Sequence, residues 1–209
     1  DRTLGTQMKA TGEVMAIERT MEASMLKAVR CLEIGLTHLE MPELKALSDE
    51  EIRAKIKNID DERCFVIAEA MRRGVTIDEI NAITKIDRWF LSKIQNIIKM
   101  ERALETHELT PSLLRKAKKM GFADKTIAAR VGKTEFEIRD LRKANGIIPT
   151  YKMVDTCAAE FEAATPYYYS CYETEDEVKV SDKKKVVVLG SGPIRIGQGV
   201  EFDYCSVHC

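Results

Sequence analysis

A glycine-rich segment, residues 190–199, directly follows an unbroken apolar run at residues 186–189. Glycines after a buried strand let backbone N–H groups approach an anion where a helix begins, which is phosphate-binding chemistry. Gly190, Gly192 and Gly197 do not have the G-x-G-x-x-G spacing of a dinucleotide site, and no Gly-Lys-Ser/Thr sequence of a P-loop follows. The segment therefore predicts the first strand and turn of an open α/β unit, with the strand buried on both faces.

Cysteine and histidine are the other residue types here that could do chemistry. The cysteines form no Cys-x-x-Cys pair, and no histidine lies at ligand spacing from any of them. A zinc site or a nucleophilic cysteine would need such a cluster or a neighbouring base. We therefore interpret the cysteines as reduced cytosolic thiols and the histidines as isolated surface or packing residues. These residues are Cys31, Cys64, Cys157, Cys171, Cys205, Cys209, His38, His107 and His208.

The composition excludes several classes of protein. The chain has 209 residues, with 33 Lys and Arg against 34 Asp and Glu, which argues against a polyanion as main partner. No stretch of about 18 apolar residues occurs, so we expect no transmembrane helix. The start has no basic region followed by an apolar one, and we therefore expect a cytoplasmic protein.

Helix signals dominate the middle of the chain, and these helices must position any functional residue. Three capping boxes, in which Ser or Thr is followed three residues later by Glu, begin at Ser48, Thr76 and Thr134. Asp87 and the pair Thr110-Pro111 mark two further helix starts. We expect a mainly α fold, with helices at about 21–34, 49–58, 88–106 and 124–131.

Two expectations concern which side chains these helices bury. A helix capped by Asp60 or Asp61 and ended by Gly74 would bury a stripe containing Cys64, Phe65, Ala68 and Met71. At the head of the helix after Asp87, Trp89 and Phe90 are interpreted as core residues rather than as a platform for a ligand.

The helical middle contains a weak internal repeat with an offset of about 47 residues. Apolar or capping residues match between two units, each a short helix followed by a longer one. The repeat predicts a duplicated helical hairpin and says nothing about chemistry. The matched pairs are Gly74 with Gly121, Ile80 with Ile127, Asp87 with Thr134, Trp89 with Phe136, Leu91 with Ile138, and Ile94 with Leu141.

The second unit, residues 125–146, also has the packing pattern of a helix-turn-helix DNA-binding motif. Its second helix would carry Glu135, Glu137 and Asp140 beside its basic residues, and carboxylates facing phosphates oppose binding. A packed helical hairpin is the simpler interpretation. A stand-alone nucleic-acid-binding regulator remains the alternative function.

Four sequence words resemble one known family, the large subunit of glutamine-dependent carbamoyl phosphate synthetase. They occur in the order of the family and reach from one end of the chain to the other. The words at 154–161 and 192–204 are the more specific ones, and residues 167–173 match the family together with the former. The words are QMKATGEVMA at 7–16, NAITKIDRWF at 81–90, VDTCAAEF at 154–161 and GPIRIGQGVEFDY at 192–204.

The resemblance implies a fragment from the centre of that subunit. Residues 1–35 resemble the C-terminal tail of the first ATP-grasp half, which makes carboxyphosphate and then carbamate. Residues 36–150 resemble the helical oligomerization domain, and 151–182 an extended connector. Residues 183–209 resemble the truncated start of the second half, a pre-ATP-grasp α/β domain ahead of the site that makes carbamoyl phosphate.

The resemblance also implies partners and cofactors for the parent enzyme, an ATP-dependent ligase that serves arginine and pyrimidine biosynthesis. It uses bicarbonate, glutamine-derived ammonia and two ATP with magnesium or manganese, and it works with a small glutaminase subunit. We expect self-association through the helical domain and contacts with the remaining ATP-grasp halves, but neither nucleic acid nor membrane as a partner. The matching words contain no complete nucleotide or metal site, so we expect no catalytic residues, cofactor or activity in this chain alone.

Three residues match family words that line an interior tunnel for carbamate, namely Glu13, Gly199 and Glu201. A labile anion needs a passage screened from water, and glycine leaves room where a side chain would block it. The alternative is that both glutamates pair with Arg or Lys in the fold. One departure is Glu18, which stands where the family usually has glycine, so the local turn is expected to differ.

Overall fold

The computed structural model describes residues 2–7, 14–165, 167–189 and 208. It confirms a mainly helical chain whose described residues include one two-stranded sheet. The helices are α1 Met21–Cys31, α2 Pro42–Lys45, α3 Asp49–Lys55, α4 Arg63–Arg72, α5 Ile77–Thr84, α6 Arg88–Thr106, α7 Pro111–Lys119, α8 Asp124–Val131 and α9 Glu135–Ala144, and the strands are β1 Thr150–Met153 and β2 Tyr168–Cys171.

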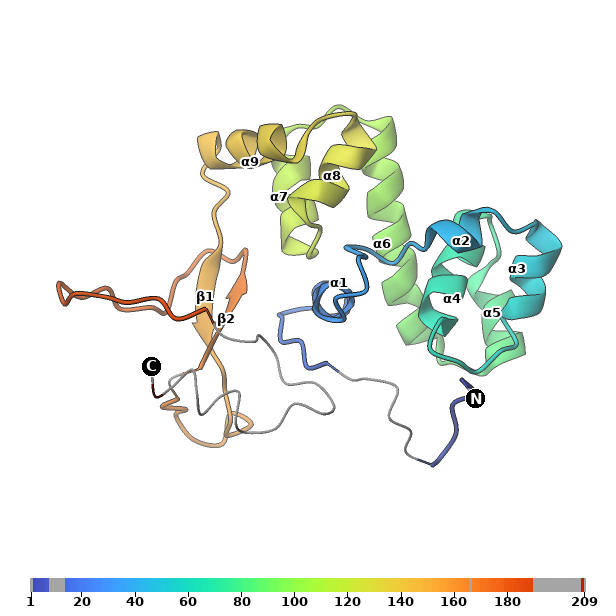
Figure 1. The fold of residues 1–209 in the computed structure, drawn as a ribbon, viewed down its shortest axis with the longest axis horizontal. Helices are drawn as coiled ribbons and strands as arrows, with labels where there is room; N and C mark the ends of the chain where they lie inside the picture. Colours follow the sequence, from blue (N-terminus) through green and yellow to red (C-terminus); the bar gives the residue numbers. More distant parts are fainter. Residues whose placement is uncertain (1, 8–13, 166, 190–207, 209) are drawn as a thin grey trace.

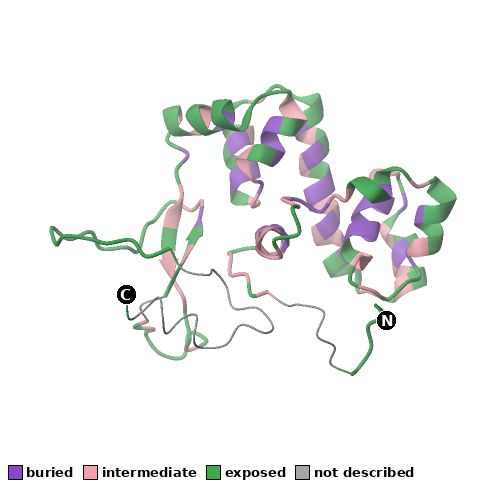
Figure 2. Cartoon of the chain, viewed as in Figure 1, coloured by how far each residue is buried: buried purple, intermediate pink, exposed green. Residues whose placement is uncertain are grey.

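The long helix α6 is the axis of the fold. Helices α2 to α5 lie on one side of it and α7 to α9 on the other, as Figure 1 shows. Helices α1, α4, α5 and α8 all contact α6 directly. Buried residues lie mainly on the facing sides of these helices, whereas the strand pair is mostly half-buried or exposed and the arm after it is exposed (Figure 2).

Local sequence explains where most helices begin. All three predicted capping boxes form, with Ser48, Thr76 and Thr134 accepting from the third helical N–H while the Glu at that position caps in return. Asp87 accepts from the backbone N–H of Trp89 at 2.7 Å, and Pro111 occupies the first position of α7. Each device satisfies N–H groups that a helix start leaves unpaired.

Some predicted bounds and buried positions are wrong. Helix α1 ends at Cys31 rather than 34, and α3 ends at Lys55 rather than 58. Helix α4 begins after Glu62 without a side-chain cap. Cys64, in the first turn of α4, is exposed, although Phe65, Ala68 and Met71 of the same predicted stripe are buried.

The duplicated hairpin is confirmed by backbone geometry. Gly74 and Gly121 both have φ +89°, where only glycine is unstrained. The amide of Val75 donates to Ala70 at 3.0 Å, and the equivalent amide of Phe122 donates to Ala117 at 3.1 Å. Two pairs of matched apolar residues are buried completely, with an exposed fraction of 0%, namely Ile80 with Ile127 and Leu91 with Ile138.

Helix α1 belongs to the same core as the helices that follow it. Leu26 is completely buried and Val29 nearly so, and α1 packs against α6. Gly121 lies so close to α1 that a Cβ built on it would be 2.8 Å from the Cα of Ala23. Helix α1 is therefore tied to the helical region by packing.

The connector contains more order than an extended link. Strands β1 and β2 pair antiparallel, with Thr150 opposite Cys171 and Met153 opposite Tyr168. The predicted buried strand at residues 186–189 is wrong for the chain as described, because Val187 is 82% and Leu189 92% exposed. A strand buried on both faces needs neighbouring strands and covering helices, and none of the described residues supplies them.

Candidate functional site

The three predicted tunnel residues, Glu13, Gly199 and Glu201, lie outside the described residues. Glu18, which departs from the family pattern, is described. Its carboxylate lies 2.7 Å from Lys27 Nζ, and the same ammonium group donates to the carbonyl of Ile17 at 2.8 Å. The ion pair therefore connects the segment before α1 to Lys27 in that helix.

A buried ionic network joins the two helical units. His38 Nε2 lies 2.6 Å from Glu101 Oε1 on α6, and both side chains are almost completely buried. The guanidinium of Arg72 from α4 donates a hydrogen bond to each carboxylate oxygen of Glu101, both at 2.8 Å, and another to the carbonyl of Leu39. Arg130 from α8 approaches Glu101 Oε2 at 3.4 Å. One carboxylate thus connects α4, α6, α8 and the segment before α2.

The charges in this network set the protonation of its members. Burial alone would raise the pKa of Glu101, but the hydrogen bonds from Arg72 and His38 outweigh it and lower that pKa to about 2. Burial lowers the pKa of His38; the hydrogen bond to Glu101 opposes this, and the charges of Arg72 and Arg130 add to it. At neutral pH the network is therefore an ionised Glu101 bound by an arginine and a neutral histidine. A neutral His38 places its proton on Nε2, the nitrogen beside Glu101.

The described part of the chain offers no metal centre. No three His, Cys, Asp or Glu side chains within it gather in a way that could hold a metal ion. Its four cysteines, Cys31, Cys64, Cys157 and Cys171, are free thiols. None of the helices in this part has the length and apolar character that crossing a bilayer requires.

The face of α9 does not suit phosphate binding. Arg142 turns inward to bind Asp124 at 2.7 Å and is only 12% exposed. Arg139 and Lys143 remain on the exterior, opposed by Glu135 and Asp140 on the same short helix. The balance of charge on this surface therefore gives no attraction to a polyanion.

An aromatic pair at the head of α6 is exposed, so the prediction that Trp89 and Phe90 are core residues is wrong. Trp89 is 53% and Phe90 47% exposed, and their rings meet edge to face with centroids 5.0 Å apart. Lys93 Nζ lies 4.9 Å from the centroid of the Trp89 ring. The helical phase of the buried residues Leu91 and Ile94 already places the pair off the core stripe.

The repeat places a third exposed aromatic at the equivalent point of α9. Phe136, the partner of Trp89 in the repeat, is 73% exposed. Large exposed apolar side chains that gather at one place mark candidate contact surfaces. Of the two positions, the head of α6 offers two adjoining rings and α9 only one.

Comparison with known proteins assigns both parts of the chain to one enzyme subunit. Residues 13–146 match the family described as "Carbamoyl-phosphate synthetase large chain, oligomerisation domain". Residues 182–209 match "Carbamoyl phosphate synthase preATP-grasp domain". The helix-turn-helix regulator considered as the alternative function is not supported by these matches.

A curated relative extends this similarity over nearly the whole chain. The carbamoyl phosphate synthase large chain of Thermoanaerobacter pseudethanolicus is 60% identical over 207 residues. The alignment covers 99% of this chain but 19% of the relative, so the chain spans about a fifth of that protein's length. The chain belongs to the carbamoyl phosphate synthase large-chain family and contains the family's oligomerisation domain.

Proposed function

We propose that the helical region of this chain associates with a second copy of itself and so joins carbamoyl phosphate synthase large chains. The match of residues 13–146 to the family's oligomerisation domain is the observation that carries the proposal. The exposed rings of Trp89 and Phe90 supply a surface for it. Aromatic side chains combine large apolar area with few rotatable bonds, which makes them effective centres of protein contacts.

The whole protein would then be the ATP-dependent ligase that the matched names imply. It would make carbamoyl phosphate from bicarbonate, glutamine-derived ammonia and two ATP, for arginine and pyrimidine biosynthesis in the cytoplasm. ATP with magnesium or manganese would bind in the ATP-grasp halves, and a small glutaminase subunit would supply ammonia. The region described above would serve as a scaffold between those halves, without a catalytic residue of its own.

Light scattering over a wide concentration series tests the association at two salt concentrations. We expect a concentration-dependent dimer or larger species in the 209-residue chain. Association should persist at high salt, because apolar contacts are not screened as surface ion pairs are. The double variant Trp89→Ser, Phe90→Ser should shift the midpoint of association to higher concentration.

Phe136→Ser is the matched control, because it removes an even more exposed aromatic ring from the equivalent position of the repeat. It should leave the association midpoint unchanged. A strictly monomeric chain at every concentration would contradict the proposal. Equal weakening by the α6 and α9 variants would contradict the assignment of the contact to the head of α6.

A further inference from the structure

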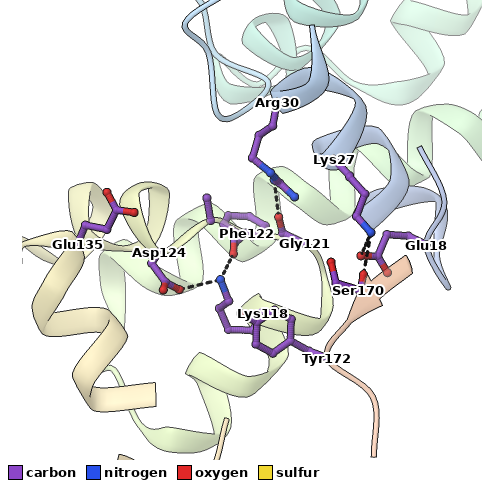
Figure 3. Close-up of a pocket in the computed structure, with 11 residues that line it drawn as sticks. Glu18, Lys27, Arg30, Lys118, Gly121, Phe122, Asp124, Glu135, Ser170 and Tyr172 are labelled. Carbon is purple, nitrogen blue, oxygen red and sulfur yellow. Dashed lines mark hydrogen bonds and ion pairs between the residues drawn. The ribbon is translucent and has the colours of Figure 1, made fainter. Parts of the chain in front are cut away.

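A cavity of about 260 Å³ lies where the helical region meets the strand pair. Its walls come from the segment before α1, from α1 itself, from the α7–α8 turn, from the start of α9 and from β2 (Figure 3). Charged side chains from several of these elements face it. The pairing of each of these charges decides what the cavity can hold.

The two lysines in the cavity wall already bind other groups of the protein. Lys27 directs its three N–H groups at Glu18, the carbonyl of Ile17 and the carbonyl of Ser170, at 2.7 to 2.8 Å. Lys118 binds Asp124 Oδ1 at 2.7 Å and the carbonyl of Phe122 at 2.8 Å, as Figure 3 shows. Its ammonium group also lies 4.8 Å from the centroid of the Tyr172 ring.

The cationic charge around the cavity exceeds what its buried carboxylates neutralise. Lys118 and Arg142 share the single carboxylate of Asp124, each binding one of its oxygens at 2.7 Å. Burial lowers the pKa of Lys118; Asp124 opposes this, and the charges of Arg142 and Arg30 add to it. Asp124 therefore balances only one of the two cations that share it, and Arg30 has no carboxylate of the described residues hydrogen-bonded to it.

Arg30 is the cation of the cavity wall with the most open donors. Nη1 donates to the carbonyl of Gly121 at 2.8 Å, and no other hydrogen bond or ion pair joins the guanidinium to the described residues. A guanidinium has five N–H groups in a planar fork that fits two oxygens of one anion. Burial lowers the pKa of Arg30, as expected for a cation withdrawn from water without a carboxylate partner.

We propose that this cavity binds a small oxyanion, a carboxylate or phosphate group, with the Arg30 guanidinium as its two-pronged anchor. The ammonium groups of Lys27 and Lys118, held in place by their own partners, add positive charge around it. The volume accommodates a ligand of metabolite size but no polymer segment. Occupancy would join α1 to the α7–α8 turn through the anion as well as through the Arg30–Gly121 hydrogen bond.

Glu135 decides between the two kinds of oxyanion. Glu135 lines the same cavity at the start of α9, where it is also exposed to solvent, and no hydrogen bond or ion pair with another described residue neutralises its carboxylate. A doubly charged phosphate is repelled by this carboxylate more than a singly charged carboxylate is. The cavity should therefore prefer a monocarboxylate, and Glu135→Gln should improve the binding of phosphate more than that of acetate.

The test is a titration of the 15N-labelled 209-residue chain with sodium acetate or sodium phosphate, followed by NMR. Sodium chloride holds the ionic strength constant, so that only specific binding moves signals. We expect saturable shifts of the Gly121, Phe122 and Ala123 amides, with acetate binding more tightly. Amide chemical shifts that do not saturate with anion concentration, or saturable shifts confined to other parts of the chain, would overturn the proposal.

Variants identify the anchor. Arg30→Gln should weaken acetate binding by about tenfold or more, since a charge-assisted pair of hydrogen bonds is lost. Arg88→Gln is the control, because it removes an exposed arginine that lies outside the cavity and pairs with Asp78. Circular dichroism verifies that each variant is folded. Unchanged affinity in folded Arg30→Gln would contradict the role of Arg30, and the wild-type titration tests the cavity even if that variant unfolds.

Discussion

His38 and Glu101 are 63 residues apart in the sequence, yet His38 Nε2 lies 2.6 Å from Glu101 Oε1 in the interior of the helical region. Their contact joins the segment before α2 to the C-terminal half of α6. The arginines on either side fix the charge states, so that the pair consists of a neutral ring donating to a carboxylate. Stability should respond to pH through both groups.

Acidification should destabilise the fold in two stages. Between pH 7 and 5 the unfolded chain takes up a proton on His38, near its ordinary pKa of 6.5, that the folded state resists. Below pH 4.5 the unfolded chain protonates Glu101, whose folded pKa is about 2. The urea midpoint of unfolding should therefore fall from pH 7 to 5 and fall further towards pH 3. His38→Gln retains an N–H donor but cannot titrate, so its midpoint should change less between pH 7 and 5. A wild-type midpoint that rises on acidification would contradict this account.

Gly121→Ala should cost more free energy of unfolding than Gly74→Ala. Both glycines have φ +89°, so the backbone strain of a side chain is equal, at about 1 to 2 kcal/mol. Only at Gly121 would the new Cβ meet another element, 2.8 Å from the Cα of Ala23, whereas nothing lies within 4 Å of a Cβ at Gly74. Overpacking adds about 1 to 3 kcal/mol. Urea unfolding of the two variants measures the difference, and equal costs would mean that α1 does not hold this close approach.

The capping boxes of α5 and α9 should contribute equally. Thr76→Ala and Thr134→Ala each remove a hydroxyl that accepts from the N–H three residues on, at 3.2 and 3.3 Å. We expect each to lower the free energy of unfolding by about 1 kcal/mol. Serine at either position preserves the acceptor and serves as control. A Thr134→Ser chain as unstable as Thr134→Ala would show that the methyl group, rather than the cap, provides the stability.

Gly199→Leu tests the predicted carbamate tunnel in a full-length large chain with its small subunit. A leucine side chain at a tunnel wall would narrow the passage, so ATP hydrolysis should continue while carbamoyl phosphate formation declines. The measurement is the ratio of ADP to carbamoyl phosphate formed. Gly5→Leu, at a described glycine where nothing lies within 4 Å of an added Cβ, is a control that should leave the ratio unchanged. An unchanged ratio in Gly199→Leu would refute the tunnel assignment.

Sequence reasoning located the helix starts and the duplicated hairpin because both depend on nearby residues. Thr134 and Glu137 cap a helix through contacts within one turn, so their spacing alone predicts the structure. The four sequence words likewise indicated the family of the chain. The surface at the head of α6 was missed, although the phase of Leu91 relative to Trp89 in the helix contained the signal.

Local patterns in the sequence therefore specify the helical character of the chain, its repeat and its family. Which charges are paired follows instead from the packing of distant elements. Arg30 retains open donors while Lys27 is saturated, and no spacing rule distinguishes the two, since both lie on α1. Arg30 binds the carbonyl of Gly121, about 90 positions further along the chain, and Lys27 binds the carbonyl of Ser170, about 140 positions further along. Such contacts depend on how separate elements pack, and packing is a property of the whole chain rather than of any local pattern.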